Sequence, residues 1–157
     1  MIRPSLHTYP MKALYTTILF LFIATTGLTG HAQVSQQPFK GTFVNKNNKM
    51  TLVLDLYEVG LEAPGLEFLG KVGAYLSGKG VYGTWLLTSH RINGKKAILR
   101  MSTDTGSDAQ TIELTQLNDS TFNYRTVGGN EIKKAQGRKL VKTPSQMLFT
   151  RMAQPAS

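Results

Sequence analysis

Hydrophobic and polar residues alternate along most of the chain after residue 32, and the alternation is clearest over residues 50–57. Every second residue there is apolar: Met50, Leu52, Leu54 and Leu56. Successive side chains of a β-strand point to opposite faces, so this period of two predicts a strand with one apolar face. Residues 39–44 predict its partner strand, and the polar segment 45–49 predicts the turn of a hairpin.

The only tryptophan of the chain lies in a second such segment, residues 80–88. Gly80 and Gly83 interrupt a run of β-branched and aromatic residues, which is typical of a strand that bends or passes close to another backbone. Trp85 shares the apolar parity of this segment with Val81 and Leu87. We therefore expect Trp85 to fill the interior of the domain.

Weaker alternation predicts further strands over residues 66–76, 97–102, 110–117, 120–127, 131–135, 139–142 and 147–152. The first of these contains Gly70 and Gly73, which suggest a bulge or a sharp bend, and Phe68 and Tyr75, which are candidate aromatic residues of the core or its rim. Turns are predicted at Asn93-Gly94 and at residues 128–130, and residues 59–65 read as a loop. No sustained helical period follows residue 32. The pattern predicts an all-β antiparallel meander of eight to ten strands that closes into a small barrel.

The first 32 residues have the layout of a secretory signal peptide. Met11-Lys12 begins a short basic region, an apolar run follows, and Gly30-His31-Ala32 offers a small-x-small cleavage site, so translation starting at Met11 is an alternative to Met1. The apolar run is shorter than the roughly 20 residues that a membrane-spanning helix needs, although an uncleaved anchor is the alternative. We expect a disordered leader over 33–38, one domain over 39–152 and a tail over 153–157, with no transmembrane segment in the mature protein.

Composition limits which cellular compartments and which partners are plausible for this protein. The chain has no cysteine, so disulfides and thiolate metal sites are excluded, and an exported domain of this kind suggests a bacterial periplasmic or extracellular protein. The predicted signal peptide holds Arg3 and Lys12, which leaves 16 basic and 9 acidic side chains in the remaining 125 residues. Such a charge favours an anionic surface or glycan as a partner, and export argues against nucleic acid. Only Lys133-Lys134 and Arg138-Lys139 are adjacent, so a merely solvated basic surface is the alternative.

Candidate catalytic chemistry is sparse. Asp104-Thr105-Gly106-Ser107 copies the active-site tetrapeptide of aspartic proteases, but that chemistry needs two carboxylates and the chain has no second copy. An ordinary turn explains these residues. His90 is the single histidine after residue 32, so neither a histidine-rich metal site nor a histidine-based triad is supported. We predict no catalytic residue, no metal site, no cofactor and no enzymatic activity.

One pair of motifs resembles a known group of barrels. Gly41-x-Phe43 lies on the predicted first strand and Phe149-Thr150-Arg151 on the last. This arrangement resembles the calycins, which include lipocalins, fatty-acid-binding proteins and avidins, where an arginine of the final strand packs across the aromatic ring of a Gly-x-Trp motif. Phe43 stands in place of the family's tryptophan, and Gly83-Thr84-Trp85 matches the triplet better but lies in mid-chain. The resemblance implies a lipocalin-like barrel; the alternative is ordinary strand residues with a surface arginine.

Parity also sorts the strand residues into two faces. Charged Asp55, Arg100, Glu113 and Arg125 fall on the outer parity. The predicted inward set carries no charge: Met50, Leu52, Leu54, Leu56, Val81, Trp85, Leu87, Ala97, Leu99, Met101, Ile112, Leu114, Phe122 and Tyr124. Such an interior is either a dry core or a pocket for an apolar molecule.

Two functions therefore remain open. The first is a barrel that holds a hydrophobic small molecule or lipid through eight inward residues: Leu54, Trp85, Leu87, Leu99, Met101, Leu114, Phe122 and Tyr124. The second is an interaction module with a filled core, which binds a protein or an anionic glycan through its loops and basic surface. A cavity of a few hundred cubic ångströms inside the barrel would favour the first.

Overall fold

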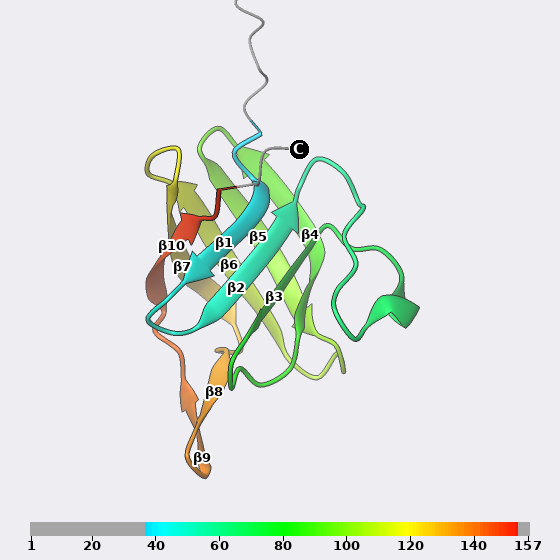
Figure 1. Ribbon diagram of the computed structural model, residues 1–157, viewed down its shortest axis with the longest axis vertical. Coiled ribbons are helices and arrows are strands. Elements are labelled where there is room, and N and C mark those ends of the chain that lie inside the picture. The colour runs from blue at the N-terminus through cyan, green and yellow to red at the C-terminus, as the bar shows by residue number, and fades with distance from the viewer. Residues whose placement is uncertain (1–36, 154–157) are drawn as a thin grey trace, which may run out of the picture. The chain divides into compact units, whose positions relative to one another are not determined.

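The computed structural model describes residues 37–153, and almost all of their regular structure is β-strand (Figure 1). The main sheet contains β1 (Lys40–Asn45), β2 (Met50–Asp55), β3 (Ala74–Gly78), β4 (Trp85–Asn93), β5 (Lys96–Thr103), β6 (Ala109–Gln116), β7 (Thr121–Gly129) and β10 (Gln146–Arg151). A separate two-stranded sheet contains β8 (Lys133–Gln136) and β9 (Lys139–Lys142), and a single 3-10 turn, η1, covers Glu67–Leu69. The all-β prediction is confirmed. The predicted signal peptide lies outside the described residues, as do most of the predicted leader and tail.

The main sheet closes into an eight-stranded antiparallel barrel. Its strands follow one another around the barrel in chain order, with β8 and β9 inserted between β7 and β10. Closure is made by β1, which pairs with β2 on one side and with β10 on the other. Each barrel strand then has two partners and the barrel has no free edge, which is the expected advantage of closing a meander.

An up-and-down barrel places alternate connections at the same end. The β1–β2, β3–β4 and β5–β6 turns therefore share one end with the β7–β10 connection, which contains β8 and β9 and projects downward in Figure 1. The opposite end carries the long loop 56–73 between β2 and β3. The end that carries β8 and β9 is the more basic of the two.

The strand predicted over residues 66–76 is wrong in its first half. Residues 67–69 form η1, and β3 begins only at Ala74. Gly70 has a φ of +82°, which side-chain-bearing residues rarely adopt, and it ends the 3-10 turn. Phe68 is 80 % exposed and not a core residue, whereas Tyr75 is half-buried on β3.

The segment around the tryptophan also differs from the prediction, because β4 begins at Trp85 and not at Gly80. Gly80 and Gly83 have φ values of +80° and +75°, so the chain bends there instead of extending. The Tyr82 N–H donates to the carbonyl of Lys133 at 2.9 Å, and the Ala135 N–H donates to the carbonyl of Gly80 at 2.7 Å. Residues 80–82 therefore pair with β8, which lies outside the barrel.

Gly128 and Gly129 were expected in a hairpin turn, but they form the end of β7. Gly129 pairs with Gln110 of β6, and a Cβ atom on Gly129 would lie 2.2 Å from the carbonyl oxygen of Ala109. Only glycine permits such a close approach of two backbones. The hairpin turn lies further along, between β8 and β9.

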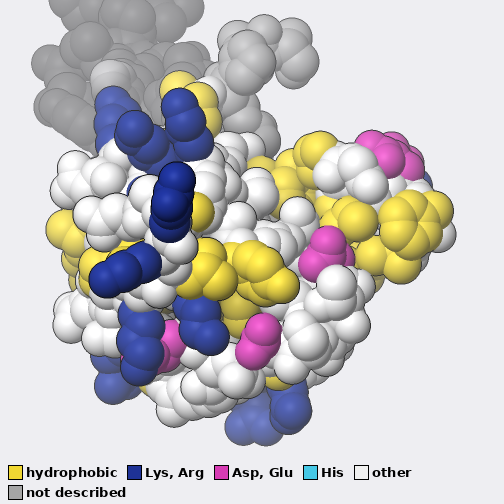
Figure 2. Space-filling model, turned by 90° about the horizontal axis from the view of Figure 1, so that it is seen from below, with side chains coloured by type: hydrophobic (Ala, Val, Ile, Leu, Met, Phe, Trp, Pro, Cys, Tyr) yellow, Lys and Arg dark blue, Asp and Glu magenta, His cyan; other side chains and the backbone are white. Residues whose placement is uncertain are grey.

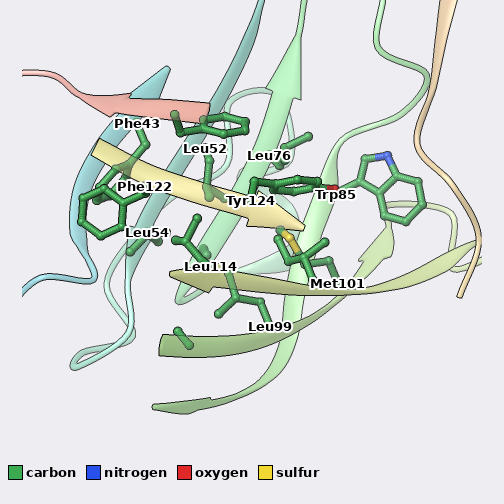
Figure 3. Packing of buried hydrophobic residues seen from close by; sticks show 14 of the residues in the cluster. Phe43, Leu52, Leu54, Leu76, Trp85, Leu99, Met101, Leu114, Phe122 and Tyr124 are labelled. Carbon is green, nitrogen blue, oxygen red and sulfur yellow. The ribbon is translucent and has the colours of Figure 1, made fainter. Parts of the chain in front are cut away.

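The inward parity is confirmed by burial. Every member of the predicted inward set is buried except Val81 and Leu87, which are partly buried and pack against the core (Figure 3). The structure adds seven core residues that lay outside that set: Phe39, Phe43, Ala74, Leu76, Ile132, Met147 and Phe149. Arg100 and Arg125 are exposed on the outer face, as predicted.

Asp55 corrects the prediction for the outer parity, because this side chain is only 8 % exposed. Its carboxylate lies 2.8 Å from the Lys40 ammonium and accepts the backbone N–H groups of Tyr57 and Glu58, each at 3.1 Å. The chain that leaves β2 turns back over the carboxylate and covers it. Burial of an outward-pointing residue by a following loop cannot be read from strand parity.

Candidate functional site

The interior of the barrel is occupied by aromatic side chains. The Phe43 and Phe122 rings meet edge to face with centroids 4.7 Å apart, and Phe39 contacts Phe122 at 6.1 Å. Tyr124 and Phe149 lie 5.6 Å apart. An eight-stranded barrel is just wide enough for its own side chains to fill it or for one small ligand. These ring contacts favour the filled arrangement.

The polar groups inside the barrel are paired with each other. The Tyr124 hydroxyl donates to the Gln110 side-chain oxygen at 2.6 Å, and Gln110 is 2 % exposed. Burial raises the pKa of the Tyr124 hydroxyl well above its ordinary range. Because the hydroxyl already has a protein acceptor, it is not held open for a ligand.

Arg151 is the last residue of β10, and it packs over the aromatic core where β10 pairs with β1. Its guanidinium carbon lies 5.2 Å from the centre of the Phe43 ring and 5.3 Å from that of Phe122. A guanidinium nitrogen also donates to the carbonyl of Pro38. An arginine of the last strand thus packs across the aromatic residue of the Gly-x-Phe motif, which is the contact that the calycin resemblance implies.

Three hollows open on the outer surface of the described residues. The largest of the three, about 480 Å³, lies over the outer faces of β4, β5 and β6. Its lining contains Ser89, His90, Arg91, Ile98, Arg100 and Thr111. A second, of 340 Å³, lies beside Arg151, and a third, of 270 Å³, lies between loop 56–73 and β4. All three lie outside the barrel interior.

The 270 Å³ hollow lies beside a short seam of the barrel, between β3 and β4. β3 and β4 share only two register pairs, Tyr75 with Leu86 and Leu76 with Trp85. Leu87 lines the hollow, with Asp55 and His90 among its polar neighbours. Burial opposes the charge of Asp55, but the Lys40 ammonium and two backbone N–H groups outweigh it, so its pKa is lowered. The carboxylate is thus held by protein partners and is not free to act as a base.

The opposite end of the barrel is basic. Three segments of this end are hydrogen-bonded to one another: the β1–β2 turn, residues 79–82, and residues 133–142. The Lys79 N–H donates to the carbonyl of Lys49 at 3.1 Å, and the Lys134 ammonium donates to the carbonyl of Asn48 at 2.7 Å. Residues 80–82 then pair with β8. Eight basic residues stand on these segments, which we call the basic end: Lys46, Lys49, Lys79, Lys133, Lys134, Arg138, Lys139 and Lys142.

Half of the residues from Lys133 to Lys142, which we call the basic ribbon, are Lys or Arg. All of the ribbon is exposed except Lys134, which is half-buried against the β1–β2 turn. Leu140 and Val141 are 52 % and 37 % exposed. Figure 2, which looks at this end of the barrel, shows Lys and Arg side chains gathered on one side with hydrophobic side chains beside them.

Few acidic groups balance this charge. Among the described residues, the only ion pair of the basic end joins Lys142 to Glu131 at 2.5 Å. Asp104 and Asp108 lie nearby in the β5–β6 turn and form no ion pair within the described part of the chain. Elsewhere on the barrel, by contrast, Glu113 pairs with both Arg125 and Lys96. The uncompensated positive charge is therefore concentrated at one end.

The protease-like tetrapeptide forms the turn between β5 and β6. The Gly106 N–H donates to the carbonyl of Thr103 at 2.8 Å, and the Asp104 carboxylate accepts the Thr105 N–H at 3.1 Å. These bonds are those of a turn, as expected for this composition.

Residues 37–153 contain no group of three or more histidine, aspartate or glutamate side chains placed to hold a metal ion. Nor do they contain a helix of the length and apolarity required to cross a membrane.

The eight residues predicted to contact a ligand lie together. Seven are buried in the core cluster: Leu54, Trp85, Leu99, Met101, Leu114, Phe122 and Tyr124. Leu87 is partly buried and also lines the 270 Å³ hollow. Their role in ligand contact stays a prediction.

The sequence did not predict the basic end as a site, because its members are dispersed along the chain. Only the adjacent basic pairs of the ribbon indicated it.

Comparisons with known proteins place the chain in no family. No protein-family model matches it, and no curated protein matches it. Among solved structures, it is similar to Treponema pallidum Tp0751 (pallilysin), with 14 % sequence identity and a TM-score of 0.49 over 93 % of this chain and 100 % of the other. What the strand pairing establishes is a closed eight-stranded antiparallel barrel.

Proposed function

We propose that the protein is a non-enzymatic binding module that holds an anionic partner at its basic end, with the barrel as a rigid scaffold. The observation that carries the proposal is the assembly of eight basic side chains on three hydrogen-bonded segments, with one ion pair to an acidic residue among the described residues. Gathering like charges is unfavourable in the free protein, and an anionic partner relieves that repulsion.

The filled interior supports this proposal over the binding of a hydrophobic molecule inside the barrel. The aromatic rings contact one another, and the buried Tyr124 hydroxyl and Gln110 side chain satisfy each other. A ligand inside would have to displace rings that are fully buried. We therefore assign these residues to the core, and native mass spectrometry that finds a co-purifying lipid would restore the interior-pocket hypothesis.

A soluble sulfated polysaccharide is a suitable probe for the basic end. We expect binding at low salt that weakens as ionic strength rises, since exposed charges are screened. Replacing Lys133, Arg138, Lys139 and Lys142 by Gln should weaken binding by roughly fourfold or more, because each exposed charge contact contributes about 0.2–1 kcal/mol.

A matched control removes the same number of exposed cations elsewhere: Lys71, Arg91, Lys95 and Arg100, each to Gln. Both variants have the same net charge, so a non-specific effect would weaken them equally. Binding that falls mainly in the control variant would place the partner in the 480 Å³ hollow, which Arg91 and Arg100 line, and would refute the proposal for the basic end.

A further inference from the structure

The basic ribbon carries exposed aliphatic side chains among its cations. Leu140 is 52 % exposed and Val141 is 37 % exposed. Tyr82, 55 % exposed, lies on the other side of β8 from these two residues, and its N–H donates to the carbonyl of Lys133. Single exposed apolar residues are ordinary, but three of them on the basic ribbon and the segment paired with it combine two kinds of chemistry.

The strand register puts an aliphatic residue between cations on each face of the ribbon. Leu140 pairs with Ala135, so it shares a face with Lys133 and Lys142. Val141 pairs with Lys134, so it shares the other face with Lys134 and Lys139. Long lysine side chains can lie along apolar surface while their ammonium groups reach outward, which suits the boundary between an apolar phase and charged groups.

The ribbon is fixed at its base and open at its tip. Ile132, directly before β8, is 1 % exposed and belongs to the barrel core, and its carbonyl accepts the Thr143 N–H at 2.8 Å. Gly137 at the tip has no atom within 4 Å of the position that a Cβ would occupy. A partner can therefore approach the tip without displacing other parts of the barrel.

We propose that this ribbon docks on the surface of an anionic lipid bilayer. Leu140, Val141 and Tyr82 enter the headgroup region, and the Lys and Arg side chains contact the lipid phosphates. The inference rests on the proposed function and names its partner. A soluble anionic glycan would satisfy the cations but would leave the two aliphatic side chains in water, whereas a bilayer surface satisfies both.

The test compares vesicles with a soluble polyanion. Residues 33–157, the predicted mature form, should co-sediment with vesicles of phosphatidylglycerol and phosphatidylcholine, and should not co-sediment with pure phosphatidylcholine. Replacing both Leu140 and Val141 by Ser should weaken vesicle binding by roughly tenfold or more, because the apolar transfer is lost. The same variant should bind the sulfated polysaccharide within about twofold of the wild type, since its cations are unchanged.

A matched control replaces Val59 and Leu117 by Ser, since these side chains are 67 % and 54 % exposed in loop 56–73 and in the β6–β7 turn, at the end of the barrel opposite the ribbon. The control should bind vesicles as the wild type does, and thermal unfolding should confirm that both variants are folded. Equal vesicle binding by the Leu140/Val141 variant and the wild type would overturn the inference. Polysaccharide binding without vesicle binding would leave the proposed function standing and identify a glycan partner, and failure to bind either probe would refute both.

Discussion

Arg151 and Phe43 are register partners across the junction of the last and first strands, and the Arg151 guanidinium carbon lies 5.2 Å from the centre of the Phe43 ring. The same guanidinium reaches the Phe122 ring and the carbonyl of Pro38. One side chain thus joins β10, β1, β7 and the chain that enters the barrel. Because β1 and β10 share only two register pairs, this contact reinforces a short seam.

Replacing Arg151 by Ala should lower the free energy of unfolding by about 2–4 kcal/mol, since it removes a cation–π contact and a hydrogen bond from a charged donor. Arg151→Lys keeps the charge but not the planar overlap with the rings, so we expect an intermediate loss. Urea unfolding measures both. Arg138→Ala, at the exposed tip of the ribbon, is the control and should change stability by less than about 0.5 kcal/mol; equal losses for Arg151 and Arg138 would argue against a structural role for the contact.

Trp85 is 2 % exposed, and its indole N–H donates to the carbonyl of Tyr82 at 3.3 Å. Trp85→Ala should cost about 3–5 kcal/mol of stability, because a large buried ring leaves a cavity. Leu86→Ala, on the outer parity and only half-buried, should cost clearly less. As the only tryptophan, Trp85 should also emit at shorter wavelength in the native than in the unfolded protein. Emission typical of tryptophan in water would show that the burial of Trp85 is wrong.

The buried hydrogen bond between Tyr124 and Gln110 is open to a double-mutant cycle. Tyr124→Phe should lower stability by about 1–3 kcal/mol, because the Gln110 oxygen loses its donor while remaining buried. Adding Gln110→Met removes the orphaned group and should recover part of that loss. Denaturant unfolding of the three variants provides the coupling energy, and additive effects would mean that the two side chains do not interact.

Tyr124 also makes stability depend on alkaline pH. Burial raises the pKa of the hydroxyl in the folded chain above its ordinary value of 10.0. At a pH between the unfolded-state and folded-state pKa values, the folded chain therefore holds a proton that the unfolded chain has lost. The contribution is present below pH 10 and declines as pH rises beyond it. The stability difference between wild type and Tyr124→Phe should therefore shrink above about pH 10. A difference that is constant from pH 8 to pH 11 would contradict the raised pKa.

Asp55 makes stability depend on pH in the opposite direction, because its contribution is lost at low pH. Burial alone would raise its pKa, but Lys40 and the backbone N–H groups of Tyr57 and Glu58 lower it below the ordinary value of 3.8. The stabilisation is therefore complete above about pH 4 and is lost as pH falls through the folded pKa. Asp55→Asn should destabilise the protein at pH 7, and the difference from wild type should shrink toward pH 2. Glu62→Gln, in an exposed pair with Lys71, is the control and should show little effect at either pH.

The sequence alone determined the strand content and which side chains point inward. Alternation along residues 50–57, 97–102 and 110–117 identifies the apolar face of each strand, because parity is a local property of an extended backbone. The same reasoning placed Arg100 and Arg125 on the outside and predicted the turn at Asn93-Gly94. It failed at residues 66–73 and 80–84, where positive φ values at Gly70, Gly80 and Gly83 bend the chain away from the strand that the apolar residues suggested.

The tertiary structure decided what the barrel presents to a partner. Whether a set of inward residues encloses a pocket depends on how ring volumes from different strands fit together, and no strand carries that information by itself. Lys46, Lys79 and Lys133 are far apart in sequence, and the segments that carry them lie together because a closed antiparallel barrel brings alternate connections to one end. Asp55 is buried for a similar reason, since the loop that follows β2 covers it. Local periodicity specifies strands and faces, whereas a shared surface is created only by long-range strand pairing.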